Sequence, residues 1–570
     1  MAPDHRRLDA LRRDRGPIPE HVIDEYVAGR LSRRDFLRRG AMVGLSLPAL
    51  GGILAACGSS SPTSSSSGPS PSSSSGTTAG KAGATITAGF LAPSSSPNPI
   101  TVNDTGGIEL LNQVGQMLVF YDNHSIPKPW LATSWSPNAD ATVWTFKIRQ
   151  GVRFSDGTPM TVDDVVYSFK TQSDPKSSGN ALSVFGGVLD PSGVVKVDAQ
   201  TVAFHLQAPY GAFPYAASSA NYNVIIVPNG TDYAKWIDTF IGTGPFMKTS
   251  FNETVGATFV RNPHYWGTPA SPSELKVVFF PNEGPMTAAL QSGSIDCMDQ
   301  FTVTVSPQLL HGSYNVTNIK SSAHRELSMR NDISPFTSNY ARQAVALTLD
   351  RPGIVAALFK GYAALGNDNP FAPVFPQTDT SVPQRHQDLA LARKLLARAG
   401  VPRGFSASLV TEQLQEVPEL AQIVKASAAK IGVDIKLTVE SQTQYYGQAV
   451  FGKSPWLDAE MSLVDYGARP VPDLYLEAPL QTINAKTGSG SWNAAHFNNP
   501  GYDKLSKEYI AASDLSTQRK LAGQIQRLLL DETPIIYAYF YNYLSASQKN
   551  IHGTYPQAGG QFFLEKTTKS

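Results

Sequence analysis

Two short motifs in the C-terminal half of the chain carry the residue types of a nucleophilic serine. Ser427 is followed three residues later by Lys430, and Lys486-Thr487-Gly488 lies further along the chain. Enzymes that use these motifs attack acyl groups with the serine hydroxyl, which a nearby base activates. A serine hydrolase of the cell envelope is therefore the enzyme class that the sequence raises first.

The order and setting of these motifs argue against that class. The Ser-x-Asn motif belongs between the other two, whereas Ser491-Trp492-Asn493 follows the Lys-Thr-Gly motif. Ser427 also falls late in an alanine-rich helix predicted over residues 418–431, not at a helix start facing a cleft. The chain has no Gly-x-Ser-x-Gly elbow and no phosphate-binding loop. We interpret both matches as chance, and we predict that the protein is not an enzyme and has no catalytic residues.

The amino-acid composition argues against several other classes of function. The only cysteines are Cys57 and Cys297, and no His-Glu-x-x-His or Cys-x-x-Cys spacing occurs, so no metal site or cofactor follows from the motifs. The net charge of +1 implies no basic face, so we do not expect a nucleic-acid partner. A hydrophobic content of 41% is enough for a large buried core, and 570 residues suggest more than one lobe.

The N-terminal region has the pattern of an export signal. Arg33 and Arg34 form a twin-arginine motif, and the next uncharged stretch covers residues 40–54. As a helix, that stretch would be about 22 Å long, short of the roughly 30 Å hydrocarbon core of a bilayer. A charged segment followed by a short apolar one is typical of a signal peptide and not of a membrane span. We therefore predict a twin-arginine signal peptide over residues 1–56.

Cys57 ends this apolar stretch in the sequence Leu54-Ala55-Ala56-Cys57, which resembles the lipobox of bacterial lipoproteins. Small residues before the cysteine suit a signal peptidase, and the thiol can carry a thioether-linked diacylglycerol. Residues 59–80 are almost entirely Ser, Pro, Gly and Thr, a composition that stays flexible. We predict a lipidated cysteine and tether over residues 57–83, and a cell-membrane location on the extracytoplasmic face.

The remaining sequence mixes helices and strands. Alternation of Trp144, Phe146 and Ile148 with polar residues predicts a half-buried strand over residues 142–149. Thr161 and Asp164 have the spacing of a capping box at the start of a helix. Apolar periodicity predicts further helices over residues 389–399, 418–431 and 517–530, and a strand over 433–439. Helix, glycine and strand in succession predict an α/β fold class.

Several segments of this body, in order, resemble the extracytoplasmic solute-binding proteins of the dipeptide, oligopeptide and nickel class. These proteins feed ABC transporters. Each segment alone is modest evidence, but together they span roughly residues 84–544. The matching segments are Trp130-Leu131-Ala132 through Ser168, Gly242-Thr243-Gly244-Pro245-Phe246, Arg261 to Trp266, residues 289–296, Ala341 to Ala344 with Leu349-Asp350-Arg351, and Phe497 to Asp503.

The resemblance implies a two-lobed periplasmic-binding-protein-like fold of the large class, with two chain crossings between the lobes. We expect lobe 1 over residues 84–328 and 538–570, with an extra subdomain at about 126–240, and lobe 2 over residues 329–537. The crossings are expected near residues 325–330 and 534–541. Ligand is enclosed when the lobes close, and a monomer then meets a membrane permease and its ATPase. An oligosaccharide or a metal chelate as ligand, or a role as a sensor receptor, would use the same fold.

The family pattern also indicates ligand contacts in the segment Asp465-Tyr466-Gly467-Ala468-Arg469-Pro470. In peptide-binding members, an aspartate in an Asp-x-x-x-Pro segment receives the α-amino group, so Asp465 is the candidate amine anchor. The alternative is a surface or hinge aspartate that pairs with Arg469 or caps a turn. Leu463 replaces a tryptophan of the pattern, and residues 411–416 lack the arginine that holds a dipeptide's carboxylate. A longer peptide or another ligand therefore remains open, with Tyr466, Trp456 and Trp492 as candidate stacking faces.

Overall fold

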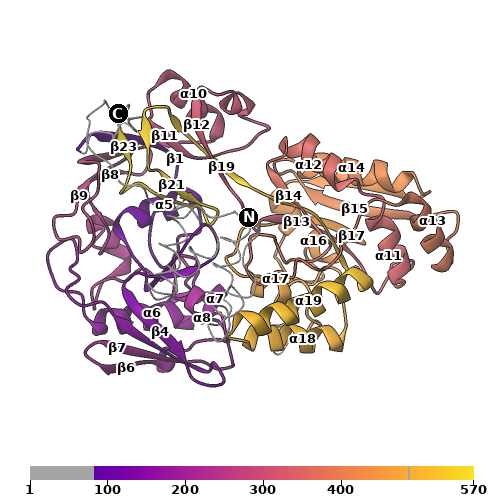
Figure 1. Cartoon of the computed structure of the whole chain (residues 1–570), viewed down its shortest axis with the longest axis horizontal. Coiled ribbons are helices and arrows are strands. Elements are labelled where there is room, and N and C mark those ends of the chain that lie inside the picture. The colour runs from indigo at the N-terminus through magenta and orange to yellow at the C-terminus, as the bar shows by residue number, and fades with distance from the viewer. Residues whose placement is uncertain (1–82, 95, 486–487) are drawn as a thin grey trace, which may run out of the picture. The chain divides into compact units, whose positions relative to one another are not determined.

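The computed structural model describes residues 83–94, 96–485 and 488–570. The predicted export signal, Cys57 and most of the tether lie outside these residues, as do Lys486 and Thr487. Within the described part, no helix is long and apolar enough to cross a membrane. The described residues form two large β-sheets with their helices, which we call lobe 1 and lobe 2 (Figure 1).

The central sheet of lobe 1 is mixed and has the strand order β12-β19-β11-β1-β10-β9-β8. Strand β1 runs parallel to both β10 and β11, and the outer pairs are antiparallel. Ile86, Ala88 and Phe90 alternate along β1 and are fully buried, as a period of two requires. The strands are β1 (Thr85–Leu91), β8 (Phe246–Asn252), β9 (Gly256–Arg261), β10 (Glu274–Phe280), β11 (Cys297–Phe301), β12 (Tyr314–Ile319) and β19 (Tyr543–Gln548).

Two capped helices, α5 (Thr105–Val114) and α10 (Glu283–Ser292), pack on this sheet. The side chain of Asp104 accepts a hydrogen bond from the Gly107 amide and so fixes the start of α5. The end of the chain returns to the same lobe, where strand β22 (Gln561–Phe563) contacts α5. Cys297 is fully buried in β11, so it contributes an apolar surface to the core of lobe 1.

A four-stranded antiparallel sheet forms a subdomain of lobe 1, in the order β4 (Ala132–Pro137), β5 (Val143–Ile148), β7 (Thr201–His205), β6 (Val194–Asp198). The predicted strand at 142–149 is confirmed as β5, and its three alternating apolar side chains are buried. Helix α6 (Val162–Ser173) starts at the predicted capping box, in which the Asp164 carboxylate accepts from the Thr161 amide at 2.6 Å.

Lobe 2 is built on a six-stranded sheet in the order β14-β18-β13-β17-β15-β16. Strands β15, β16 and β17 are parallel neighbours, and β13 is antiparallel to both β17 and β18. The strands are β13 (His324–Met329), β14 (Ala363–Leu365), β15 (Ser406–Glu412), β16 (Asp434–Glu440), β17 (Met461–Tyr466) and β18 (Ile535–Tyr541); the main helices are α11 (Asn339–Ala346), α12 (Arg351–Phe359), α13 (Leu389–Arg398), α14 (Val417–Ala429), α18 (Pro500–Ala511) and α19 (Leu515–Glu532).

The helices predicted for this lobe are confirmed as α13, α14 and α19, with ends within three residues of the predicted ones. Gly400 and Gly432 follow α13 and α14 with φ of +80° and +88°. This left-handed conformation suits glycine and ends both helices. Helix α19 begins at Leu515, two residues earlier than predicted. Asp514 caps it, because the Asp514 carboxylate accepts a hydrogen bond from the Thr517 amide.

The chain passes between the two sheets at residues 320–323, which join β12 to β13, and at Asn542, which joins β18 to β19. The segments expected to cross, 325–330 and 534–541, instead form strands β13 and β18 of the lobe 2 sheet. Both strands are buried. Strand β18 is apolar and aromatic, whereas the charged side chains of β13 find their partners inside the fold, where Arg325 pairs with Asp465 and Glu416.

A buried ion cluster in lobe 2 links the start of α12 and the segment before α13 to strand β18. The Asp368 carboxylate, fully buried, accepts hydrogen bonds from Arg351 and Arg385, each at 2.6 Å. It also accepts from the Tyr537 amide at 3.2 Å, which ties the cluster to β18. One carboxylate thus balances two arginines that have little access to water.

We predict that Asp368→Asn lowers the free energy of unfolding by about 3–5 kcal/mol, because it leaves two arginines with no buried counter-charge. Urea denaturation at pH 7 measures this change. Asp163→Asn is the matched control, since Asp163 pairs with Lys196 at 2.7 Å on the surface, and we expect less than about 1 kcal/mol there. Equal losses in the two variants would contradict the role given to Asp368.

Candidate ligand-binding site

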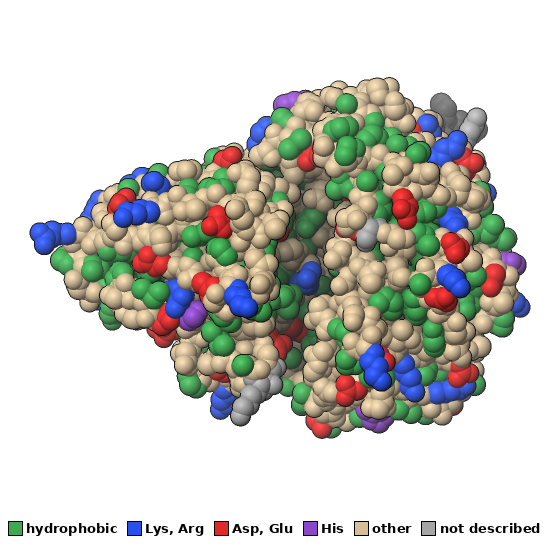
Figure 2. Space-filling view, turned by 180° about the vertical axis from the view of Figure 1, so that it is seen from behind, with side chains coloured by type: hydrophobic (Ala, Val, Ile, Leu, Met, Phe, Trp, Pro, Cys, Tyr) green, Lys and Arg blue, Asp and Glu red, His purple; other side chains and the backbone are tan. Residues whose placement is uncertain are grey.

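A cavity of about 650 Å³ lies between the subdomain of lobe 1 and the helical edge of lobe 2. Figure 2 shows the hollow between the lobes from one side, with charged and hydrophobic side chains inside it. Lobe 1 contributes residues 183–184, 187–188, 208–210, 215–216 and 220–223, and lobe 2 contributes residues 469–471, 473–474, 477, 481, 489, 492, 507–508 and 510–511.

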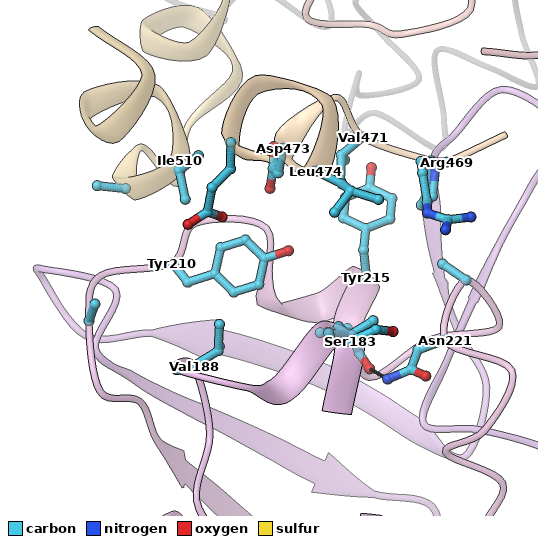
Figure 3. A pocket seen from close by; sticks show the side chains of 18 of the residues that line it. Ser183, Val188, Tyr210, Tyr215, Asn221, Arg469, Val471, Asp473, Leu474 and Ile510 are labelled. Atoms are coloured by element: carbon cyan, nitrogen blue, oxygen red, sulfur yellow. Dashed lines mark hydrogen bonds between the residues drawn. The ribbon is translucent and has the colours of Figure 1, made fainter. Parts of the chain in front are cut away.

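The lobe 1 wall consists of aromatic and small residues placed by the subdomain. Tyr210 lies in the loop after β7, and its carbonyl accepts a hydrogen bond from the Trp144 indole of β5 at 3.0 Å. Tyr215 belongs to the short helix α8 (Phe213–Ala216), and its hydroxyl donates to the Ser125 carbonyl at 2.5 Å. Both side chains border the cavity in Figure 3. No residue that lines the cavity from lobe 1 is charged.

The lobe 2 wall begins where β17 ends and continues through residues 467–472 into helix α17 (Asp473–Glu477). Ser322, in the first crossing, fixes this segment: its hydroxyl donates to the Arg469 carbonyl at 2.7 Å and accepts from the Arg469 amide at 2.8 Å. The Tyr475 hydroxyl donates to the Gly467 carbonyl at 2.5 Å. The backbone that carries Arg469 is therefore attached to the crossing between the lobes.

The two walls meet at a backbone contact on one side of the cavity. The Gly211 amide of lobe 1 donates to the Ile510 carbonyl at the end of α18, at 2.8 Å. A Cβ atom at position 211 would lie 1.9 Å from the Ala512 carbonyl oxygen. Only glycine allows the lobes to approach this closely at that point.

The charges of the cavity all lie on lobe 2. Arg469 lines it with an exposed side chain whose guanidinium donates to the Ala468 carbonyl at 3.1 Å. Asp473 is 7% exposed. Burial, then the nearby Glu477, raise the pKa of the Asp473 carboxyl to about 7, although a hydrogen bond from Tyr210 opposes this shift. Glu477, Lys507 and Glu508 complete the charged lining.

The predicted ligand contacts divide into two groups. Arg469 and the half-buried Trp492 line the cavity. Trp456 is 5% exposed and packs against Tyr446 in the core of lobe 2. Tyr466 is 6% exposed, and its ring stacks on His324 at 5.6 Å. The cavity lining does not include Trp456, Tyr466 or Asp465.

Asp465 instead takes part in an ion cluster around Arg325. The two residues are directly opposite each other on β17 and β13, and the Arg325 guanidinium donates to the Asp465 carboxylate. Arg325 is 1% exposed and also pairs with Glu416 at 2.9 Å. Its guanidinium lies 4.4 Å from the centre of the Tyr541 ring. The partner of Asp465 is thus Arg325, across the sheet, and not the Arg469 of its own segment.

Sequence reasoning missed Tyr210, Tyr215 and Asp473. The two tyrosines lie in a loop and a four-residue helix that have no periodic pattern, and an aspartate at a helix start has the usual signature of a cap. Their convergence depends on the packing of segments more than 250 residues apart. Within the described residues no group of three or more His, Cys, Asp or Glu side chains could hold a metal ion.

The Ser427 and Lys430 pair lies away from the cavity. Ser427 is buried on the core-facing side of α14, and Lys430 is exposed at the end of the same helix. Neither residue lines the cavity.

The chain is similar to proteins that bind solutes outside the cytoplasm. It is 26% identical over 514 residues to the dipeptide-binding protein DppE of Bacillus subtilis, which covers 84% of this chain and 90% of that protein. It is 24% identical over 485 residues to the glutathione-binding protein GsiB of Escherichia coli, covering 82% and 91%.

Solved structures show the same two-lobed fold. HbpA2 from Haemophilus parasuis matches with a TM-score of 0.75 and 23% identity, over 85% of this chain and all of that one. The oligopeptide-binding protein AppA from Bacillus subtilis, in complex with a nonapeptide, matches with a TM-score of 0.65 and 20% identity, over 86% and 100%. The family model "Bacterial extracellular solute-binding proteins, family 5 Middle" matches residues 127–485. This match covers more than half of the chain, which therefore belongs to the family 5 bacterial extracellular solute-binding proteins.

Proposed function

We propose that this chain is the substrate-binding component of an ABC importer and that it captures a peptide in the cavity between its lobes. The observation that carries the proposal is the cavity itself, which has walls from both lobes. Its volume of about 650 Å³ lies within the range of roughly 300–1,000 Å³ that is usual for sites that enclose a small ligand.

The chemistry of the lining favours a peptide. Apolar and aromatic faces such as Tyr215 and Trp492 suit the side chains of a peptide, and the exposed guanidinium of Arg469 suits its carboxyl terminus. Relatives named as dipeptide- and glutathione-binding proteins support this choice, as do the solved relatives that hold the peptide STSA and Met-Leu. Two further relatives were solved with Ni(L-His) and with agropinic acid, so other ligands belong in the test.

The two crossings supply the means of reporting occupancy. We assign lobe 1 to residues 83–319 and 543–570 and lobe 2 to residues 324–541, so that only residues 320–323 and Asn542 join them. A ligand that contacts Arg469 and Tyr215 together binds both lobes and favours the closed arrangement. The closed lobes present a different surface to a permease and its ATPase, which is how binding is read out.

We also propose that the mature protein is held at the outer face of the cytoplasmic membrane by lipid on Cys57. The twin arginines at 33 and 34, the short apolar stretch and the residues before Cys57 support this proposal. A tether of about twenty Ser, Pro, Gly and Thr residues would let the lobes reach the permease.

Ligand class is tested by thermal shift of the chain from residue 83 with mixed di- to decapeptides, oligosaccharides and metal chelates in separate wells. We expect peptides to stabilise the protein, by about 2.7 kcal/mol when the ligand is at a hundred times its Kd. Stabilisation by oligosaccharides or chelates alone would overturn the peptide proposal and leave the family unchanged.

Arg469→Gln is expected to weaken the binding of peptides with a free carboxyl terminus by about 10- to 100-fold, because a charge-assisted hydrogen bond is lost. Calorimetric titration with each peptide and with its C-terminal amide measures the effect, which should vanish for the amide. Arg153→Gln is the control, since Arg153 is exposed on lobe 1 outside the cavity. Equal losses for acid and amide would contradict a carboxylate contact.

Cys57→Ser is expected to release the full-length protein from the membrane fraction of the producing bacterium, because no thioether-linked lipid can form. Cell fractionation with immunoblotting follows the protein, and Cys297→Ser serves as the control because that thiol is buried in β11. Retention of the Cys57→Ser protein in washed membranes would show that another segment anchors it.

A further inference from the structure

We propose that Asp473 is the residue that receives the cationic group of the ligand, and that the preferred ligand is a zwitterion with its ammonium at Asp473 and its carboxylate at Arg469. This inference rests on the proposed function, because it names the chemistry of the same cavity. It assigns to Asp473 the role that the family pattern gives to Asp465.

The geometry around Asp473 is that of a receptor for a cation. Asp473 opens helix α17, and its Oδ2 atom is buried without a hydrogen-bond partner among the residues that the structure describes. Figure 3 shows its carboxyl group above the Tyr210 hydroxyl, with the Tyr215 ring beside it. Aromatic faces next to a carboxylate add to the attraction of a cation.

Asp473 has no counter-charge among the residues that the structure describes. No lysine or arginine in the described part of the chain forms an ion pair with it, in contrast to Asp465 and Asp368, which both pair with arginine. A buried carboxylate without a counter-charge loses hydration, which the hydrogen bond from Tyr210 replaces only in part. Because the side chain also faces a cavity, a ligand ammonium can supply the missing charge.

The groups packed around Asp473 leave this role open. Glu477 on the same helix repels the ionised form, and Lys507 acts mainly on Glu477, whose pKa it lowers against the effect of burial. The other neighbours are tyrosines that burial keeps neutral by raising their pKa values. They are Tyr210 in the loop after β7, Tyr215 on α8 and Tyr509 on α18.

Asp465 is the less suitable acceptor for two physical reasons. Its carboxylate already accepts from the Arg325 guanidinium, and the Tyr541 hydroxyl donates to the same oxygen at 3.2 Å. A ligand ammonium at Asp465 would have to approach the buried positive charge of Arg325. The other carboxyl group on the helix of Asp473, Glu477, instead attracts a cation.

Arg469 gives the ligand its direction. It lies at a different part of the cavity from Asp473, with Val471 and Tyr215 between them in Figure 3. Its exposed guanidinium can meet a carboxylate that retains some water, whereas the amine end is enclosed. A short peptide with both ends free presents these two groups on one extended backbone.

Affinity should depend on pH in a direction that this assignment fixes. The carboxyl of free Asp473 has a pKa near 7, and only its ionised form holds an ammonium. As the pH falls from 7.5 to 5.5, an increasing share of the protein must lose a proton before it binds. We expect the Kd of an ammonium-bearing ligand to rise by about 20-fold over this range, and we expect Asp473→Asn to bind weakly at both pH values.

The test uses a tetrapeptide pool that contains no Lys, Arg or His, so that the α-ammonium is its only cation, and the same pool with acetylated amino termini. Titrations of wild type, Asp473→Asn and Asp465→Asn are followed by calorimetry at pH 7.5 and pH 5.5. We expect Asp473→Asn to bind the free pool about 10- to 100-fold more weakly than wild type. We expect the wild type and Asp473→Asn to bind the acetylated pool with equal, low affinity.

Each other outcome counts against the proposal in its own way. If only Asp465→Asn lost its binding of the free pool, Asp465 would be the amine anchor, as the family pattern indicates. Tight binding of the acetylated pool would show that no ammonium is needed. Binding of neither pool would reject the peptide function, and the zwitterion assignment with it. The melting temperature of unliganded Asp473→Asn should not fall at pH 7.5, since the substitution removes an unpaired buried charge.

Discussion

The arrangement of lobe 2 depends on the charge of Arg325. This guanidinium is buried in β13, so it needs anions and polar atoms within the fold, and it finds them on three neighbouring segments. Asp465 lies opposite it on β17, Glu416 precedes α14, and the Tyr541 ring of β18 covers it. Removal of any partner would leave a charge with little hydration, which is costly inside a protein. The cluster therefore fixes how three strands meet beside the crossings.

The Arg325 cluster bears on ligand binding because it lies next to the two crossings. Residues 320–323 lead directly into β13, and Ser322 among them holds the backbone of Arg469 by two hydrogen bonds. On the second crossing, Tyr541 ends β18 immediately before Asn542. A rotation of the lobes about these short segments would thus change the surroundings of a cavity-lining residue through a contact that already exists. The same contact, between Ser322 and the backbone of Arg469, thus belongs both to a crossing and to the cavity wall. Ligand binding and lobe position can therefore influence each other through it.

Local sequence patterns predicted the helices and strands, but they did not predict which residues meet in the cavity. Caps, glycine stops and alternating strands act within a few residues, which explains why β5, α6, α13 and α19 could be identified from sequence. Register across a sheet cannot be read in this way: nothing near Asp465 indicates that Arg325, 140 residues earlier, lies opposite it. The same limit applies to Asp473, whose unpaired state follows from burial under two tyrosines of the other lobe. The order of the motifs nevertheless identified the family, because all members share these long-range contacts and keep the segments that make them in the same order.

The distribution of charge over the cavity suggests an order of events. Every charged lining residue belongs to lobe 2, and the lobe 1 wall offers tyrosines, asparagines and small side chains. A zwitterion approaching open lobes therefore meets its electrostatic partners on one surface, which long-range attraction reaches first. Lobe 1 can then close over the bound ligand without bringing another charge that must lose water. Its aromatic wall excludes solvent, which strengthens the charged contacts that lobe 2 has made. Specificity for charge and enclosure by shape are in this way divided between the two lobes.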